Sequence, residues 1–177
     1  VPLIEIVSKP DIRSAEEATL YLQKLKSILS SVGVSDCKME EGSLRCDGNI
    51  SVMPKGSSVF GVRSEIKNVN SFKSLEKAFQ YEFERQTKAI ENGEKLTTET
   101  RRWDEAAGIT SIMRSKEAAN DYRYFPEGDL VTINISDEWI ENVRKTIPEL
   151  PHEKKERFIK EFGIPKYDAS VLTLTMD

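Results

Sequence analysis

Two alternating segments with a turn between them are the clearest pattern in the chain. Polar and apolar positions alternate through Arg45–Met53 and again through Val59–Lys67. Residues 54–57, which include a proline and a glycine, lie between the two runs. Two such runs around a glycine-containing turn are typical of a β-hairpin. If the turn centres on its glycine, Asp47 lies directly opposite Glu65.

The pairing of Asp47 with Glu65 brings two negative charges together. Like charges directly opposite each other destabilise a sheet, by about 3 kcal/mol at roughly 5 Å and an effective dielectric constant of about 20. A cation between the carboxylates removes this repulsion, and oxygen-only ligands on a rigid sheet suit Mg²⁺. The register has an alternative: a shift by two residues places Asp47 opposite Arg63 or Lys67, in an ordinary surface ion pair that contributes little.

One helix is predicted on each side of this hairpin. Residues 14–17 read Ser-Ala-Glu-Glu, a capping box in which the Ser14 hydroxyl and the Glu17 carboxylate satisfy backbone amides. Apolar residues then recur at helical spacing as far as Gly33. The second helix is expected from about Ser71 to Asn92. Its apolar stripe, which we expect to pack on the apolar face of the hairpin, comprises Phe72, Leu75, Phe79, Phe83 and Ile90.

Further strands are predicted at three places. Residues 2–7 indicate a buried strand that contains Glu5, residues 95–116 a second hairpin, and residues 130–135 a short strand. Glu5 is either a structural acid at a strand edge or a residue that faces the same site as Asp47. The order of elements indicates an α+β fold with a largely antiparallel sheet and helices on one face.

Beyond residue 137 the pattern becomes helical. Asp137–Thr146 and Glu153–Phe162 have amphipathic spacing, and a third helix is expected to begin with Asp168 as its N-cap. We therefore expect residues 1–137 to form one α+β domain and residues 138–177 to begin an all-α domain.

Composition narrows the class of protein. The 177 residues are 38% hydrophobic and 32% charged, with a net charge of −4, which indicates a soluble globular chain. No apolar run approaches the roughly 20 residues that a membrane span requires. Cys37 and Cys46 are not spaced as a metal motif, and a single histidine, His152, excludes a multi-histidine site. A cytoplasmic location is expected, or an organellar one in a eukaryote.

Several runs, in order along the chain, are specific when taken together. They are Val1–Val7 with Pro10–Arg13, Gly33–Asp47, Glu65–Ser71, Glu99–Arg102, Asp121–Glu127 and Ile147–Pro151. These runs closely resemble the B subunit of the glutamyl/aspartyl-tRNA amidotransferases, and the resemblance covers essentially the whole chain.

The resemblance implies an activity. Members of this family convert Glu-tRNA(Gln) or Asp-tRNA(Asn) to the amide, with a glutamine-synthetase-like cradle domain that uses ATP and Mg²⁺ to phosphorylate the side-chain carboxylate of the charged amino acid. Ammonia from the amidase subunit then displaces the phosphate. The implied partners are the amidase subunit and a small linker subunit of a heterotrimer, together with mischarged tRNA.

The resemblance also implies site residues. Asp47 and Glu65 match acids of the family's metal site, and Glu5 falls in a matching motif and is carried over as a third metal ligand. Five basic residues are candidates for the phosphates of ATP or of the tRNA acceptor end, with solvated or structural salt bridges as the alternative. They are Lys67, Arg101, Arg102, Arg114 and Arg123.

Against the family's pattern, the first half of the cradle and the tail that binds tRNA are missing. The chain lacks an initiator methionine and stops inside an apolar segment, so we expect it to be a piece of a longer polypeptide. Alone it is expected neither to turn over ATP nor to bind tRNA tightly, and no catalytic side chain is assigned within it. The alternative function is a non-catalytic module that binds tRNA or other subunits.

Overall fold

The computed structural model describes residues 3–115, 125–126 and 128–173, apart from the side chains of residues 114 and 115. The chain divides into two compact units. Unit 1 comprises Val1–Leu25 and Cys37–Glu117, and unit 2 comprises Lys26–Asp36 and Ala118–Asp177. The domain boundary expected at about residue 138 lies inside unit 2 and stays a prediction.

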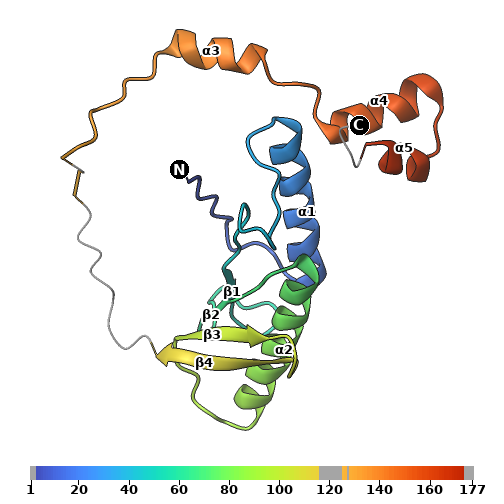
Figure 1. Ribbon diagram of the computed structural model, residues 1–177. Helices are drawn as coiled ribbons and strands as arrows, with labels where there is room; N and C mark the ends of the chain where they lie inside the picture. Colours follow the sequence, from blue (N-terminus) through green and yellow to red (C-terminus); the bar gives the residue numbers. More distant parts are fainter. Residues whose placement is uncertain (1–2, 116–124, 127, 174–177) are drawn as a thin grey trace. The chain divides into compact units, whose positions relative to one another are not determined.

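A four-stranded sheet forms the centre of unit 1 (Figure 1). Its strands are β1 (Gly48–Ile50), β2 (Ser64–Lys67), β3 (Glu99–Asp104) and β4 (Ile109–Ser115), in that spatial order. The pairs β1–β2 and β3–β4 are antiparallel, whereas β2 and β3 are parallel. The α+β class and the hairpin within residues 95–116 are confirmed. The sheet is nevertheless mixed, because the long helix between β2 and β3 acts as a crossover that returns the chain in the same direction.

The register of the first hairpin differs from the expected one by two residues. Gly48 pairs with Ile66, and Asn49 with Glu65, so the expected pairing of Asp47 with Glu65 is wrong and Asp47 comes level with Lys67. Strand pairing stops at Ile50, and the loop that follows contains a tight turn in which the Ser57 amide donates to the carbonyl oxygen of Pro54 at 3.0 Å. A two-residue turn would have set the register; with a longer loop, the sheet and the helix packed on it decide the alignment.

The two helices of unit 1 begin at the expected residues, and each has a serine as its N-cap. In α1 (Ala15–Ser31) the Glu17 amide donates to Ser14 Oγ at 3.1 Å, while the Glu17 carboxylate accepts from the amide of Arg13 at 2.6 Å, one residue earlier than expected. In α2 (Phe72–Glu91) Ser71 is the N-cap and Asn92 the C-cap. Both predicted helices are confirmed.

The apolar stripe predicts only part of the buried face of α2: Leu75 is in the core, and Phe72 and Phe79 pack against it. Phe83 and Ile90 are 50% and 48% exposed, so this part of the prediction is wrong. The face against the sheet is defined by mostly small or polar residues: Ser74, Leu75, Ala78, Glu82, Gln86 and Ala89. The helix is rotated about its axis relative to the expected orientation, because Glu82 and Gln86 bond to groups on the sheet. The hydrophobic pattern does not show these polar contacts.

The hydrophobic core of unit 1 lies between α1, α2 and the sheet. Its buried members are Leu22, Ile66, Val69, Leu75, Ala78 and Trp103. Cys46 packs against this core, where burial and then the charge of Asp47 raise the pKa of its thiol to about 11. The thiol therefore stays protonated at neutral pH and behaves as a small apolar side chain.

Two predicted strands are not formed by the residues that the structure describes. Residues 3–9 are extended but have no strand partner, and Leu3 and Val7 are 85% and 81% exposed. Residues 130–135 are likewise exposed and irregular. Apolar runs of this kind predict strands, but a strand requires a neighbour to satisfy its backbone groups.

Unit 2 contains the predicted helices of the C-terminal part. They are α3 (Asp137–Lys145), α4 (Pro151–Phe162) and α5 (Lys166–Leu172). The expected N-cap at Asp168 is wrong, because α5 begins two residues earlier, after Pro165. Along the described ranges, no helix combines the length and the apolar character that a membrane crossing requires.

Candidate functional site

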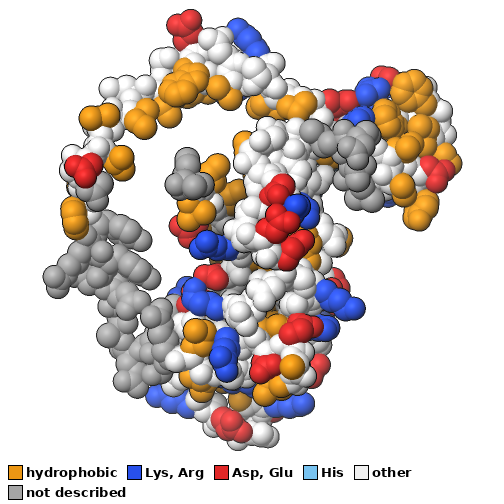
Figure 2. Space-filling view, viewed as in Figure 1, with side chains coloured by type: hydrophobic (Ala, Val, Ile, Leu, Met, Phe, Trp, Pro, Cys, Tyr) orange, Lys and Arg blue, Asp and Glu red, His pale blue; other side chains and the backbone are white. Residues whose placement is uncertain are grey.

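The candidate site lies on the face of the sheet opposite α2. Side chains alternate between faces along a strand, and Ser64, Arg101 and Thr110 bond to residues of α2. The opposite face therefore carries Glu65, Lys67, Thr100 and Arg102, with Asp47 just before β1. Figure 2 shows basic and acidic side chains interspersed over the part of the molecule that holds the sheet.

Lys67 lies between the two acids of the predicted metal site. Its Nζ is 2.5 Å from Asp47 Oδ2 and 3.2 Å from Glu65 Oε1. The hydrogen bond to Asp47, and then that to Glu65, outweigh partial burial and raise the pKa of Lys67. The shift by two residues thus produces the ion pair that was the alternative at the sequence level, while Glu65 remains within reach of the same ammonium group.

Thr100 fixes the carboxylate of Glu65. The two residues are partners in the β2–β3 register, and Thr100 Oγ1 donates to Glu65 Oε2 at 2.9 Å. Thr100 is 1% exposed, so its hydroxyl has little freedom to turn elsewhere. One oxygen of Glu65 is therefore held by the sheet while the other contacts Lys67.

Arg102 is the register partner of Lys67 and is exposed on the same face. Its Nε donates to Ser111 Oγ at 3.2 Å, across the β3–β4 pair. Two cationic side chains consequently lie next to two carboxylates on adjoining strands. This arrangement can hold a cation at the acids and an anion at the bases.

Arg101 belongs to a buried ionic cluster on the face of the sheet that packs against α2. Its Nε is 2.9 Å from Glu82 Oε1, its Nη1 is 2.6 Å from Glu99 Oε2, and its Nη2 donates to the backbone oxygen of Thr110 at 3.0 Å. The side chain is 8% exposed. A structural salt bridge, the alternative for each arginine, describes its position, and its role in binding phosphate stays a prediction.

Glu82 is the centre of this cluster, and the hydrophobic pattern of α2 missed it. Its carboxylate also accepts from Arg85, at 2.9 Å to each oxygen, and from the Thr110 hydroxyl. Burial raises the pKa of Glu82, but the hydrogen bonds from Arg85 and Thr110 outweigh it and hold that pKa below its ordinary value. The available signal was Arg85 three residues later, at a spacing that permits a pair within one helix turn.

Gln86, one turn further on, extends the same cluster to the first hairpin. Its Nε2 donates to Ser64 Oγ at 3.2 Å, and its Oε1 accepts from the amide of Val52 at 3.2 Å. The amide side chain thus takes the place of a strand partner just where β1 ends. This contact helps to set the register of the face that carries Glu65 and Lys67.

The remaining predicted residues are not brought to this site by the described contacts. Glu5 is exposed in the extended segment before α1. Arg114 is the register partner of Thr100, but its side chain lies outside the described residues, as does Arg123 altogether. The metal and phosphate roles of these residues stay predictions.

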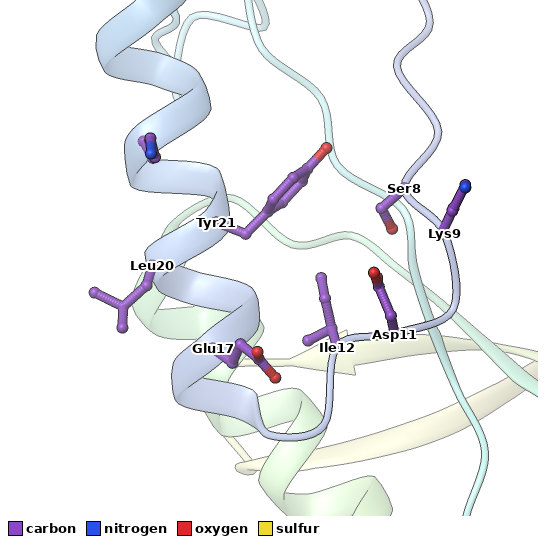
Figure 3. A pocket seen from close by; sticks show the side chains of 8 residues that line it. Ser8, Lys9, Asp11, Ile12, Glu17, Leu20 and Tyr21 are labelled. Atoms are coloured by element: carbon purple, nitrogen blue, oxygen red, sulfur yellow. The ribbon is translucent and has the colours of Figure 1, made fainter. Parts of the chain in front are cut away.

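A separate cleft of about 550 Å³ lies between residues 8–12 and α1. Figure 3 shows Tyr21 and Glu17 on the helix and Asp11 and Ser8 on the segment that faces it. Lys9 and Lys24 also line it, so both signs of charge are present. None of the predicted site residues lies there.

Comparison with known proteins decides the family. The model of the GatB/GatE catalytic domain matches residues 1–141. The chain belongs to this family. Over all 177 residues it is 79% identical to the B subunit of an aspartyl/glutamyl-tRNA(Asn/Gln) amidotransferase from Clostridium botulinum (strain Loch Maree / Type A3). Over 176 residues it is 78% identical to a B subunit, numbered 1, of the amidotransferase of the same name from Clostridium acetobutylicum.

The chain spans 37% of the length of these relatives. Within the GatB/GatE family it therefore corresponds to part of a longer subunit, and the resemblance found in the sequence is confirmed.

Proposed function

We propose that the chain is part of the ATP-dependent subunit of a tRNA-dependent amidotransferase. This subunit would activate the side-chain carboxylate of Glu-tRNA(Gln) or Asp-tRNA(Asn) by phosphorylation, for amidation with ammonia from the amidase subunit. The observation that carries the proposal is the match of residues 1–141 to a catalytic-domain family, supported by relatives named as tRNA amidotransferase subunits.

The chemistry requires a phosphoryl group to be positioned beside a carboxylate. A carboxylate is a poor acyl donor until one of its oxygens becomes part of a phosphate leaving group. Positioning and charge neutralisation provide most of the catalysis in such transfers. Lys67 and Arg102 would bind phosphate oxygens, while Thr100 holds Glu65 in place.

The chemistry of the two acids supports a metal ion at this position. The carboxylates of Asp47 and Glu65 both contact a single cationic group, the Lys67 ammonium, so one cation can lie within reach of both acids. The described residues contain no group of three or more acids, cysteines or histidines that could hold a metal ion. Asp47 and Glu65 would supply two ligands to Mg²⁺, which when bound offsets the charge of the transferred phosphoryl group.

The partners follow from the same proposal. The complete subunit would assemble with an amidase subunit and a small linker subunit in a heterotrimer, and would bind mischarged tRNA in the cytoplasm. A cytoplasmic location accords with Cys37 and Cys46 being thiols and not a disulfide, since disulfides are rare in reducing compartments.

Asp47→Asn in the complete amidotransferase complex tests the proposal. We expect amide formation on the charged tRNA to fall about a hundredfold or more, because a charge that acts in the transition state is removed. Glutaminase activity of the amidase subunit should be retained. The matched control is Glu84→Gln, because Glu84 is an exposed acid on α2. This substitution should change neither activity.

The two assays separate the proposed function from the binding module. Equal amide formation by wild type and Asp47→Asn would favour a non-catalytic module. Loss of both activities would indicate a defect in assembly and would also count against a chemical role for Asp47.

A further inference from the structure

We propose that Lys67 is an internal counter-ion that occupies the cation position between Asp47 and Glu65 and moves to the phosphates when nucleotide binds. The proposal rests on the proposed function and adds a coupling to it. Metal alone competes with Lys67, whereas metal with nucleotide does not, so the two ligands assist each other's binding.

The position of the ammonium group is the first observation. Lys67 Nζ contacts one oxygen of each acid, at 2.5 Å and 3.2 Å. The three side chains together carry one net negative charge. A divalent cation added to this group would face the ammonium at close range, so the two cations exclude each other electrostatically.

The second observation is that Lys67 has more room to move than Glu65. Glu65 is held by the buried Thr100, at 2.9 Å, and its side chain is 16% exposed. The Lys67 side chain is 33% exposed and has a flexible four-carbon stem with a compact charge at its end. Displacement therefore moves the ammonium group and leaves the carboxylate of Glu65 in place.

The third observation is the destination. Lys67 and Arg102 are register partners on β2 and β3, so their side chains leave the sheet next to each other on one face. Arg102 is exposed and bonds to Ser111 through Nε. An anion between the two bases is stabilised by both, and phosphate oxygens form strong charge-assisted hydrogen bonds with such groups.

The test uses Lys67→Met in the complete complex, with binding of Mg²⁺ alone measured by calorimetry. Without nucleotide we expect the variant to bind Mg²⁺ about fivefold more tightly than wild type, the factor that a partly exposed ion pair contributes. The KM for ATP should rise about tenfold with the loss of one charge-assisted contact. Bound nucleotide should increase the affinity for Mg²⁺ less in the variant than in wild type. This coupling factor should fall by the same factor by which the affinity for Mg²⁺ alone rises.

Two further variants serve as controls. Arg102→Met should raise the KM for ATP while leaving the affinity for Mg²⁺ alone unchanged, because Arg102 has no described contact with the two acids. Lys67→Arg keeps the charge and should keep the weak binding of Mg²⁺ alone. If Lys67→Met unfolds at a lower temperature than wild type, Lys67→Gln serves as the second variant. It also removes the charge and should likewise bind Mg²⁺ alone more tightly than wild type.

The outcomes also separate this inference from the proposed function. Unchanged or weaker binding of Mg²⁺ alone in Lys67→Met overturns the counter-ion role, as does tighter binding in Lys67→Arg. If Asp47→Asn nevertheless loses amide formation, the proposed function stands without the coupling. If Asp47→Asn retains it, the proposed function itself fails.

Discussion

At the scale of single residues, Glu105 shows how one carboxylate joins a turn to a helix. It lies between β3 and β4, and it accepts hydrogen bonds from Lys77 at 2.6 Å, Trp103 at 2.6 Å and Ser74 at 2.7 Å. The bond from Lys77, followed by those from Trp103 and Ser74, lowers the pKa of Glu105 to about 2. The hairpin turn is thereby fastened to the first two turns of α2.

A pH dependence follows from this pKa. A carboxyl group whose pKa is lower in the folded state stabilises the fold above its unfolded pKa and loses that contribution as pH falls. For Glu105 this stabilising contribution is lost as the pH falls from about 4.5 to about 2. We expect Glu105→Gln to have a lower urea midpoint than wild type at neutral pH. This difference in midpoint should disappear as the pH approaches about 2. A difference that is constant over this range would contradict the assignment.

Glu82 has a different role, because its side chain is fully buried among Arg85 and Arg101. Removing one partner of a buried ion pair leaves an uncompensated charge. We therefore expect Glu82→Gln to lower the free energy of unfolding by about 3 kcal/mol, measured by denaturant titration. The exposed Glu84 on the same helix is the control, and Glu84→Gln should stay within about 0.5 kcal/mol.

At the scale of elements, the first hairpin is held by backbone packing as well as by strand pairing. Gly61 lies against the chain just after β1, and a Cβ added at this position would come 2.0 Å from the carbonyl oxygen of Val52. The neighbouring atom is backbone, so it cannot move aside as a flexible side chain would. The close approach of residues 52 and 61 is thus part of what fixes the loop before β2.

Substitution of this glycine tests the packing. Gly61→Ala is expected to lower the free energy of unfolding by about 1–3 kcal/mol, the usual cost of overfilling a packed site. Gly128→Ala is the control, because a Cβ there meets no atom within 4 Å. Equal denaturant midpoints for the two variants would show that the loop relaxes around an added methyl group.

At the scale of the whole molecule, the chain holds only part of what the proposed reaction requires. It spans 37% of the length of its relatives, and its described residues bring two acids, Asp47 and Glu65, to one cationic group. Mg²⁺ in phosphoryl-transfer sites is held by one or two carboxylates together with the substrate phosphates. Of the bases predicted to bind phosphate, the described contacts place Lys67 and Arg102 beside these acids.

We therefore expect the 177-residue chain alone to show no ATP-dependent phosphorylation of charged tRNA. The assay is transfer of labelled phosphate from ATP, compared with the complete complex at equal concentration. Transfer at a rate near that of the complex would show that the two acids and two bases of this chain form a sufficient site.

Local patterns in the sequence were sufficient to predict the helices and to identify the family. The expected bounds of α2, about Ser71 to Asn92, agree with its caps because the end of a helix depends on neighbouring residues, and the turn between β3 and β4 is likewise local. The resemblance rests on ordered runs of residues and needed no contacts. The presence of Lys67, Glu65 and Asp47 within one hairpin was also evident from the alternating pattern.

Only the tertiary structure decided which of these residues meet. The register of β1 and β2 depends on Gln86 and on Gly61, both distant in sequence from Asp47, and a shift of two residues preserves the same alternation. The buried face of α2 depends on Arg101 and Thr110 of the sheet, which pair with Glu82. A periodic pattern repeats along its own element, so it cannot specify which residue of another element lies opposite.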